Sequence, residues 1–556
     1  MRLSASSRAV ISFDLHIPPT AKQRVNTGKL GLTDPYHVIL TGTLDIIQRL
    51  RITALSFWNI PFSHKTAITS SSAMTPKRRP SKTSNKPDEL SPMVSTRPTP
   101  HPHRDPHDKL IKRFYEPLVL QHVLGSTRGD HIPRLPPDVQ DAEEMDSISL
   151  RRDFLDKLAF VCDYEKGGAT VTAIALQQTP AAVIFWVAAN EGVGSQVKPF
   201  LETILSSLEK LHSKPAESVI KEAEDKIFQC AVEFGKLRIK AYLKCMKERL
   251  DKCHKIIAMS NSHADQGKRS VIYLKNAKSP QPHQDLMKWL TSFRPQDNDL
   301  VHLCRFAYEE RQSPHMKELA TRSHSKYAGN VDSSANNFAQ LRHYIGRIGS
   351  YMRASKIFVA AAGRFPELFV NVEVQCLSSP EPVPKPQMDK LMTLDKIAVR
   401  MLPADDKRLS DIQNALQSMD KKFEIFKRFK DRYEDDNFRP RVHAELILLE
   451  RFYVHEYPFV DGDRYIGCSK PACYCCYLYI CAHPGGFVKP PSHSKNYLNW
   501  SPPEIDPVGS VDLAIHRRDM LNSMCKEIRG DVLRQIQEQR PQRDAHHDST
   551  TGITRI

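Results

Sequence analysis

Two short stretches near the C-terminal end constrain the fold most strongly. "RPRVHAELILLERF" places His443 and Glu445 at the start of a helix with an apolar stripe, and "PACYCCYLYICAH" opens a second helix with Cys473 and Cys476. Four of the chain's 12 cysteines, beginning with Cys468, lie there within nine positions. "DRYIGCS" between the helices is typical of a strand, and the second helix has a proline near its start and "PGG" after its end. The segment predicts two helix N-termini, joined by a strand, that carry His and Cys side chains.

These residue types at helix starts are those of a catalytic zinc site. The dipole and free amides of a helix N-terminus favour thiolates, the form of cysteine that binds zinc. One His and two Cys leave the fourth position open, whereas structural zinc sites fill all four positions with protein. Side chains at positions i and i+2 can converge on one atom only at the first turn of a helix, so His443 and Glu445 can share a site there. Glu445 is then placed to take a proton from a metal-bound water. The order H-x-E then P-C-x-x-C is the signature of zinc deaminases, in which a zinc-bound hydroxide attacks an amidine carbon of cytosine or adenine.

Two other interpretations of the cysteines stay open. A closed structural zinc knuckle would draw its ligands from Cys468, Cys473, Cys475 and Cys476, and a thiol-rich aromatic core helix would bind no metal. Cys475 lies between the two predicted ligands and should face away from the metal. We therefore interpret Cys475 and Cys481 as packed thiols.

The composition favours a long chain with a basic N-terminal tail. At 556 residues the chain is expected to form about two to four domains. Residues 1–110 carry 16 Lys and Arg against 7 Asp and Glu, a net +9 of the total +16. The moderate balance of the rest does not by itself require a nucleic-acid groove. Residues 63–109 are rich in Pro, Ser, Thr and His, which predicts disorder, and "PKRRPSK" within them is a weak nuclear-import pattern.

From Leu110 the apolar pattern is mainly helical up to a Pro-rich break at Ser378–Gln387. Two β-rich runs around a turn at 169–192, and Phe369–Leu377, predict the strands of this region. Cysteines on its helices are predicted to be core or boundary thiols rather than ligands: Cys230, Cys245 and Cys253. Beyond the break, "SDIQNALQSMDKKFEIFKRFKDRYED" predicts one long charged helix. The predicted organisation is a basic, largely disordered tail at 1–109, a mainly helical region with a few strands at 110–387, a zinc deaminase-like domain at 388–510, and a C-terminal helix with a polar tail at 511–556.

"RVHAELILLERF", "YIGCSKPACYCCYLY" and "HPGGFVKPPSHSKNYLNWSPP" resemble the OTT-type deaminase-like family, a branch of the cytidine-deaminase-like superfamily common in filamentous fungi. "RRDFLDKLAFVCDYEKGGATVTAIALQQTP" is similar to the region that accompanies this domain. The resemblance is dense over 442–503 and thinner over 149–433. It implies a three-layer α/β/α core, with His443, Cys473 and Cys476 as Zn²⁺ ligands and Glu445 as proton shuttle. Ala472 separates the family's proline from the first cysteine, which is a departure in local backbone shape.

The expected fold class is thus α/β, a three-layer cytidine-deaminase-like domain preceded by a large, mainly helical region. The expected function is hydrolytic deamination, by a zinc-bound hydroxide, of an amidine C–N bond in a nucleobase, nucleotide or nucleic acid. The alternative is a non-catalytic zinc-binding scaffold whose helical region docks protein partners. Residues 437–503 carry 7 Lys and Arg against 5 Asp and Glu, which does not choose between free and polymeric substrates. Tyr497 and Trp500 are interpreted as packing residues rather than base-stacking ones.

The expected location is inside the cell, in the cytoplasm or the nucleus. No run approaches the roughly 18 apolar residues of a membrane span, and no secretory signal is recognised. Clustered cysteines without such a signal favour a reducing compartment, where they more often bind metal than form disulfides.

Overall fold

The structure is a computed structural model that describes residues 106–133, 142–212, 215–265, 281–294, 299–323, 334–504 and 511–539. The chain divides into two units, Met1–Pro98 and Thr99–Ile556, and all described residues belong to the second. Most of the stretch predicted to be disordered lies outside the described residues, as does the basic pattern within it. Helix α2 begins at Pro106, inside the predicted tail, where a proline at the first helical position is favourable.

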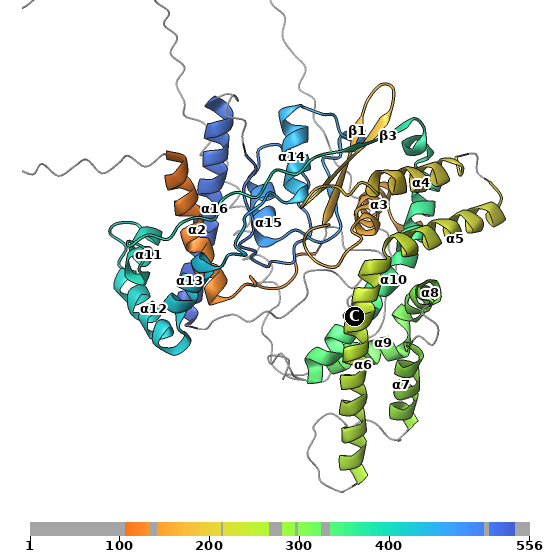
Figure 1. The fold of residues 1–556 in the computed structure, drawn as a ribbon, viewed down its shortest axis with the longest axis horizontal. Coiled ribbons are helices and arrows are strands. Elements are labelled where there is room, and N and C mark those ends of the chain that lie inside the picture. The colour runs from red at the N-terminus through yellow and green to blue at the C-terminus, as the bar shows by residue number, and fades with distance from the viewer. Residues whose placement is uncertain are drawn as a thin grey trace, which may run out of the picture. The chain divides into compact units, whose positions relative to one another are not determined.

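Helices make up most of the described structure, and they surround one small sheet (Figure 1). The α-helices are α2 (Pro106–Leu124), α3 (Ser147–Cys162), α4 (Val197–Glu209), α5 (Glu217–Phe234), α6 (Lys236–Asp265), α7 (Gln281–Ser292), α8 (Leu300–Glu309), α9 (Pro314–Ser323), α10 (Ser334–Arg364), α11 (Leu394–Met401), α12 (Leu409–Phe423), α13 (Ile425–Glu434), α14 (Ala444–Val454), α15 (Tyr474–Ala482) and α16 (Val511–Glu538). The 3₁₀ helices are η1 (Ala142–Glu144), η2 (Glu310–Gln312), η3 (Pro366–Phe369) and η4 (Val460–Gly462), and the strands are β1 (Thr172–Gln178), β2 (Val183–Ala189), β3 (Val372–Cys376) and β4 (Gly467–Cys468). None of the helices within the described ranges is long and apolar enough to cross a membrane.

The sheet is mixed and has the strand order β3-β2-β1-β4. β1 and β2 form an antiparallel hairpin in which Thr172 pairs with Ala189 and Gln178 with Val183. β3 pairs parallel with β2, and the short β4 pairs antiparallel with β1. The predicted β-rich runs, the strand near Phe369–Leu377 and the strand before the second cysteine helix are all confirmed.

Side chains on the hairpin alternate between two cores, as expected for a strand buried on both faces. Ile174 and Leu176 belong to the core that includes α3, whereas Ala173 and Ala175 belong to the core that includes α14. Helix α3 contacts β1 and β4, and α14 contacts β1 and β2. The sheet therefore lies between a helical layer on each face.

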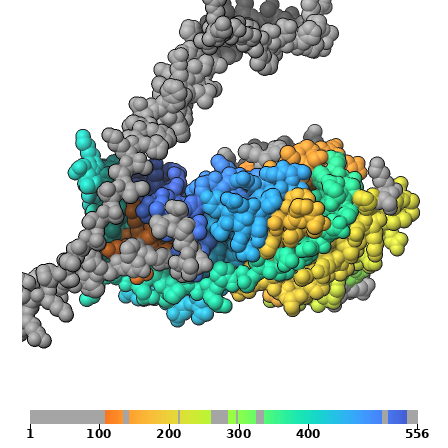
Figure 2. All heavy atoms as spheres, turned by 90° about the horizontal axis from the view of Figure 1, so that it is seen from above, coloured from red at the N-terminus to blue at the C-terminus, as the bar shows by residue number. Residues whose placement is uncertain are grey.

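The sheet crosses the sequence boundary that was expected near residue 387. Three of its strands, β1, β2 and β3, come from the predicted helical region, and only β4 comes from residues 388–510. Figure 2 shows light-blue, amber and green segments from distant parts of the sequence meeting on one face of the molecule. Because a two-residue strand cannot form a sheet alone, the C-terminal segment depends on the upstream strands for its layered structure.

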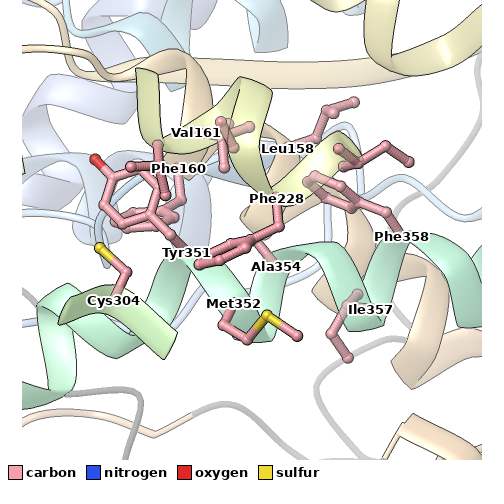
Figure 3. Close-up of a cluster of buried hydrophobic side chains, with 14 of the residues drawn as sticks. Leu158, Phe160, Val161, Phe228, Cys304, Tyr351, Met352, Ala354, Ile357 and Phe358 are labelled. Atoms are coloured by element: carbon pink, nitrogen blue, oxygen red, sulfur yellow. The ribbon is translucent and has the colours of Figure 1, made fainter. Parts of the chain in front are cut away.

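Helix α10 is the centre of the helical region and contacts α3, α5, α6, α8 and α9. Figure 3 shows Tyr351 and Phe358 of α10 beside Phe160 of α3 and Phe228 of α5. Burying one large apolar side chain contributes roughly 1.5–3 kcal/mol, so this cluster holds the helical region firmly against α3. Because α3 also covers one face of the sheet, the helical region and that face of the sheet share one of the two cores.

The cysteines of these helices are packed thiols, as predicted. Cys253 is fully buried in the core around α10, and Cys230 and Cys245 are half-buried. None of the chain's 12 cysteines, all of which are described, forms a disulfide.

The prediction of one long helix at 410–435 is wrong. The chain forms α12 and α13, which are separated by Glu424 in the left-handed region (φ 52°, ψ 46°). Apolar residues on both sides become buried, with Met419 before the break and Ile425 and Phe429 after it. A straight helix would continue one apolar stripe in a single direction, whereas the break at Glu424 lets the apolar residues of both helices become buried. Tertiary burial therefore overrides the helical propensity of the charged sequence.

Candidate metal centre

Helix α14 begins directly after His443, which confirms the predicted position of this residue at a helix start. Its backbone is extended (φ −80°, ψ 152°), and its imidazole caps no helix amide. The amide of Ala444 instead donates to Asn190 Oδ1 at 2.9 Å, and the Asn190 side chain also donates to the Gly168 carbonyl at 2.8 Å. Asn190 follows β2, so the sheet hairpin positions the start of α14. Its distance of 254 residues from Ala444 explains why the local sequence did not reveal it.

Helix α15 begins directly after Cys473, the second predicted helix start. The Cys473 backbone is extended, and its Sγ accepts a hydrogen bond from the Cys476 amide at 3.4 Å. An amide that donates to sulfur favours the thiolate over the thiol. The helix start therefore prepares one sulfur for metal binding.

The nitrogen and sulfur atoms of the predicted ligands converge. His443 Nδ1 is 3.3 Å from Cys476 Sγ and 3.6 Å from Cys473 Sγ, and the three donor atoms lie within 4.8 Å of one another. Zinc with Zn–N bonds of about 2.0 Å and Zn–S bonds of about 2.3 Å at tetrahedral angles holds such ligand pairs roughly 3.6 Å apart. The donors therefore fit a zinc ion. Neither Cys468 nor Cys475 belongs to this group, which opposes the closed four-cysteine knuckle.

The surroundings shift the pKa values of the two cysteine thiols in opposite directions. Burial raises the pKa of the Cys473 thiol, but the hydrogen bond from Cys476 and the adjacent His443 lower it more, so that it lies well below its usual value. Burial and the neighbouring Cys473 raise the pKa of Cys476 well above its usual value. A divalent cation that binds such a cluster displaces the remaining thiol proton, because cysteine ligates as the thiolate.

Glu445 lies beside the converging donors without belonging to them. It is buried, and burial raises the pKa of its carboxyl group, which also interacts with the Cys476 thiol. Glu445, His443 and Cys473 line the same pocket, so the first-turn geometry brings the two side chains of the H-x-E motif together as expected. Glu445 therefore lies next to the candidate ligands but outside their group.

Trp500 makes a contact that the sequence did not reveal. The tryptophan is fully buried, and its Nε1 donates to Cys476 Sγ at 3.2 Å. Its ring packs at 5.4 Å from the ring of Phe114 on α2. The interpretation of Trp500 as a packing residue is confirmed, but it also supports a candidate ligand.

Replacing Trp500 with phenylalanine should weaken zinc binding by about tenfold. This is the lower end of the loss expected when a metal ligand loses the hydrogen bond that orients it. The substitution keeps a buried ring and removes the N–H that stabilises the Cys476 thiolate. Competition with a zinc chelator measures the affinity. Trp186→Phe is the matched control, because its Nε1 donates to Gln177 and not to a sulfur. Equal zinc affinities in the wild type and Trp500→Phe would contradict this role.

A buried cluster around Asp163 connects the helical region to the loop that precedes Cys473. Asp163 Oδ1 accepts from Thr170 Oγ1 at 2.7 Å, and Oδ2 accepts from Ser469 Oγ at 3.0 Å and forms an ion pair with Arg238 Nη2 at 2.7 Å. Asp163 and Arg238 are fully buried. Removing one partner of a buried ion pair is strongly destabilising, so this cluster holds α3, α6 and the cysteine loop in one arrangement.

Residues 442–504 match the model of the OTT_1508-like deaminase family. This segment is therefore similar to an OTT_1508-like deaminase domain. It contains His443, Glu445, Cys473 and Cys476, which confirms the resemblance seen in the sequence. No curated protein and no solved structure gave a match to the chain. The family match covers a small part of the 556 residues, so it describes the domain rather than the whole chain.

A pocket of about 560 Å³ opens beside the candidate metal centre of the deaminase domain. One part of its wall comes from the domain itself and includes His493 and Tyr497. Another part comes from the helical region and includes Tyr242 of α6 and Tyr344 of α10. A pocket of this size is typical of a small-molecule site and exceeds what a metal ion needs.

A second group of possible ligands, near the C-terminal ends of α14 and α15, comprises Glu450, His483 and His516. The Gly485 amide donates to His483 Nδ1 at 3.0 Å, which places the proton of a neutral ring on Nε2. That nitrogen lies 3.3 Å from Glu450 Oε1, to which the Tyr479 hydroxyl also donates at 2.6 Å. The bond from Tyr479 satisfies one carboxylate oxygen, whereas the buried Nε2 atoms of His483 and His516 have no hydrogen-bond partner among the described residues. The His516 ring of α16 lies 5.0 Å from the ring of His483 and 5.5 Å from the ring of Tyr453, so these side chains also pack α16 against the ends of α14 and α15.

Proposed function

We propose that this chain is a zinc-dependent hydrolytic deaminase that acts on a substrate containing a nucleobase. The observation that carries the proposal is the convergence of His443 Nδ1 with the sulfurs of Cys473 and Cys476, next to Glu445, in a deaminase-like domain. Three protein ligands leave a fourth position for a reacting water, as in catalytic zinc sites. The pocket beside them provides access for a substrate.

Each of these residues has a distinct task in the proposed reaction. His443, Cys473 and Cys476 hold the ion, which when bound supplies a Lewis acid that activates water near neutral pH. Glu445 accepts a proton from the attacking water and delivers it to the departing amino group. A C–O bond forms, the exocyclic C–N bond breaks, and ammonia leaves, so the reaction needs no oxidant or reductant. Glu445 can carry a proton because burial brings its neutral and charged forms closer in free energy.

We also propose that the functional unit is a three-layer α/β/α fold larger than the segment matched by the family. Helices α3 and α4 contact one part of the sheet, α14 contacts the hairpin, and Asn190 and Asp163 connect upstream elements to the two helix starts. Residues 388–510 would then be the catalytic part, and residues 110–387 would complete its sheet and pocket. The free thiols suit a reducing compartment, the cytoplasm or the nucleus.

Ammonia release tests the proposed function. The full chain, purified with zinc, should release ammonia from at least one member of a panel of cytosine and adenine bases, nucleosides, nucleotides and single strands. Metal analysis should find one zinc per chain, and a chelator should stop turnover until zinc is restored. Bound zinc without turnover of any substrate would favour the non-catalytic zinc-binding protein, in which the helical region docks partners. A chain that binds no zinc would refute both.

A further inference from the structure

The helical region contributes a wall to the pocket that contains the candidate metal centre. This wall consists of Tyr242 on α6, His343 and Tyr344 on α10, and the loop 166–168 after α3. The metal-side wall includes His443. At about 560 Å³ the pocket has room for more than the base that would react at the metal. Residues of the helical wall are therefore available to the remainder of a substrate.

Tyr242 presents a polarised hydroxyl group in this wall. Its side chain is buried, and its oxygen accepts a hydrogen bond from Arg238 Nε at 3.0 Å. Because that oxygen is already an acceptor for the guanidinium group, its own proton is available to a further acceptor. The guanidinium carbons of Arg238 and Arg347 lie 5.6 and 5.8 Å from the centre of the Tyr242 ring.

The cations around Tyr242 oppose the effect of its burial. Burial alone raises the pKa of the Tyr242 hydroxyl, but Arg238, Arg347 and Lys470 lower it, and the net pKa lies below the usual value. A hydroxyl with this environment is a strong donor to an anion and a poor partner for another cation. Asp163, the acid that faces the same ring from α3, is already in its ion pair with Arg238.

Two lysines also line this pocket. Lys470 lies three residues before Cys473, and its Nζ donates to the Gly167 carbonyl at 2.8 Å. Lys166 Nζ donates to Cys245 Sγ at 3.0 Å and lies 5.9 Å from the centre of the Tyr344 ring. Gly167 has φ +150°, a conformation that L side chains rarely adopt, and the loop that carries Lys166 depends on it.

The acidic residues that line the pocket outside the metal centre are each paired with an arginine. Glu191 forms an ion pair with Arg441, and Asp435 lies 3.7 Å from Arg432. Their charges are therefore partly compensated. The wall around Tyr242 keeps a positive character suited to an anionic group of the substrate.

We propose that Tyr242, Lys166 and Lys470 form a subsite for a phosphate group of the substrate. The substrate would then be a nucleotide, either free or within a single strand, rather than a free base or nucleoside. This inference rests on the proposed function for the identity of the base, but the subsite is defined by its own residues. The metal side holds the base, and Tyr242 and Lys166 of the helical region bind the phosphate together with Lys470 of the cysteine loop.

Binding measurements test this subsite without requiring turnover. Isothermal titration calorimetry of the zinc-loaded full chain should show that 5′-CMP or 5′-AMP binds at least about tenfold more tightly than the matching nucleoside. A tenfold difference is what one charge-assisted hydrogen bond to the phosphate is expected to contribute. Tyr242→Phe should remove most of this difference and leave nucleoside binding unchanged. Lys470→Met should act in the same direction, and it leaves the Tyr242–Arg238 bond intact in case Tyr242→Phe folds poorly. Raising the salt concentration should reduce the preference, because exposed lysine charges are screened.

Lys489→Met is the matched control, because Lys489 is exposed and does not line the pocket. This variant should bind the nucleotide and the nucleoside as tightly as the wild type does.

A single-stranded oligonucleotide, titrated in parallel, shows whether the phosphate belongs to a free nucleotide or to a strand. If either of them binds more tightly than the nucleoside, the result supports the subsite. Equal affinity of nucleoside and nucleotide in the wild type overturns it, even if ammonia is released. A phosphate preference without any ammonia release leaves the subsite standing and refutes the proposed function instead.

Discussion

Glu445→Gln should reduce ammonia release by about 10² to 10⁴-fold while zinc content stays at one per chain, because a general acid–base group is lost and the ligands are kept. The glutamine amide has nearly the same shape as the carboxyl group and cannot carry the proton from water to the leaving amine. Since Glu445 is buried and its pKa is raised, a neutral side chain at this position should not destabilise the fold. Steady-state kinetics and metal analysis of the same preparation measure both quantities.

Glu450→Gln is the matched control for this variant. Glu450 lies on the same helix but interacts with Tyr479 and His483 and does not line the pocket. It should keep turnover within a few-fold of the wild type, because its substitution leaves the first turn of α14 unchanged. Full turnover in Glu445→Gln would reject Glu445 as the proton shuttle.

His443→Ala should reduce bound zinc from one per chain to nearly none. Two sulfurs alone leave an incomplete set of ligands, and deprotonated cysteines without a metal are unfavourable in a buried site. In the wild type, a chelator should lower the melting temperature, because a ligand that binds only the folded state stabilises it by mass action. In His443→Ala the melting temperature should no longer respond to the chelator. Elemental analysis and thermal unfolding with and without chelator provide the two measurements.

Cys475→Ala separates this centre from the four-cysteine alternative. Cys475 is fully buried next to the ligands but lies outside the group of converging donors. The variant should keep its zinc and lose only some packing energy. Loss of zinc from Cys475→Ala, together with retention in His443→Ala, would favour the closed knuckle over the open site.

Much of the candidate site could be predicted from the sequence because its signals are local. The extended residue before an apolar-striped helix identified the position of His443, and the proline and "PGG" around "CYCCYLYIC" identified the helix after Cys473. The β-rich runs at 169–192 were recognised for the same reason, since strand periodicity extends over a few neighbouring residues. Where burial competes with propensity, local signals fail, as at Glu424, which divides the predicted long helix in two.

The sequence by itself determined which residue types stand at the two helix starts, and hence the metal chemistry to expect. The tertiary structure decided that these starts meet, with Asn190 at Ala444, Trp500 at Cys476 and Asp163 at the cysteine loop. It also decided that the sheet takes three strands from the helical region, and that this region supplies Tyr242 to the pocket. The physical reason is the distance along the chain over which each kind of interaction acts. Helix capping and apolar periodicity involve residues within a turn or two of one another. Tertiary hydrogen bonds and shared cores join residues hundreds of positions apart, so they produce no pattern in the local sequence.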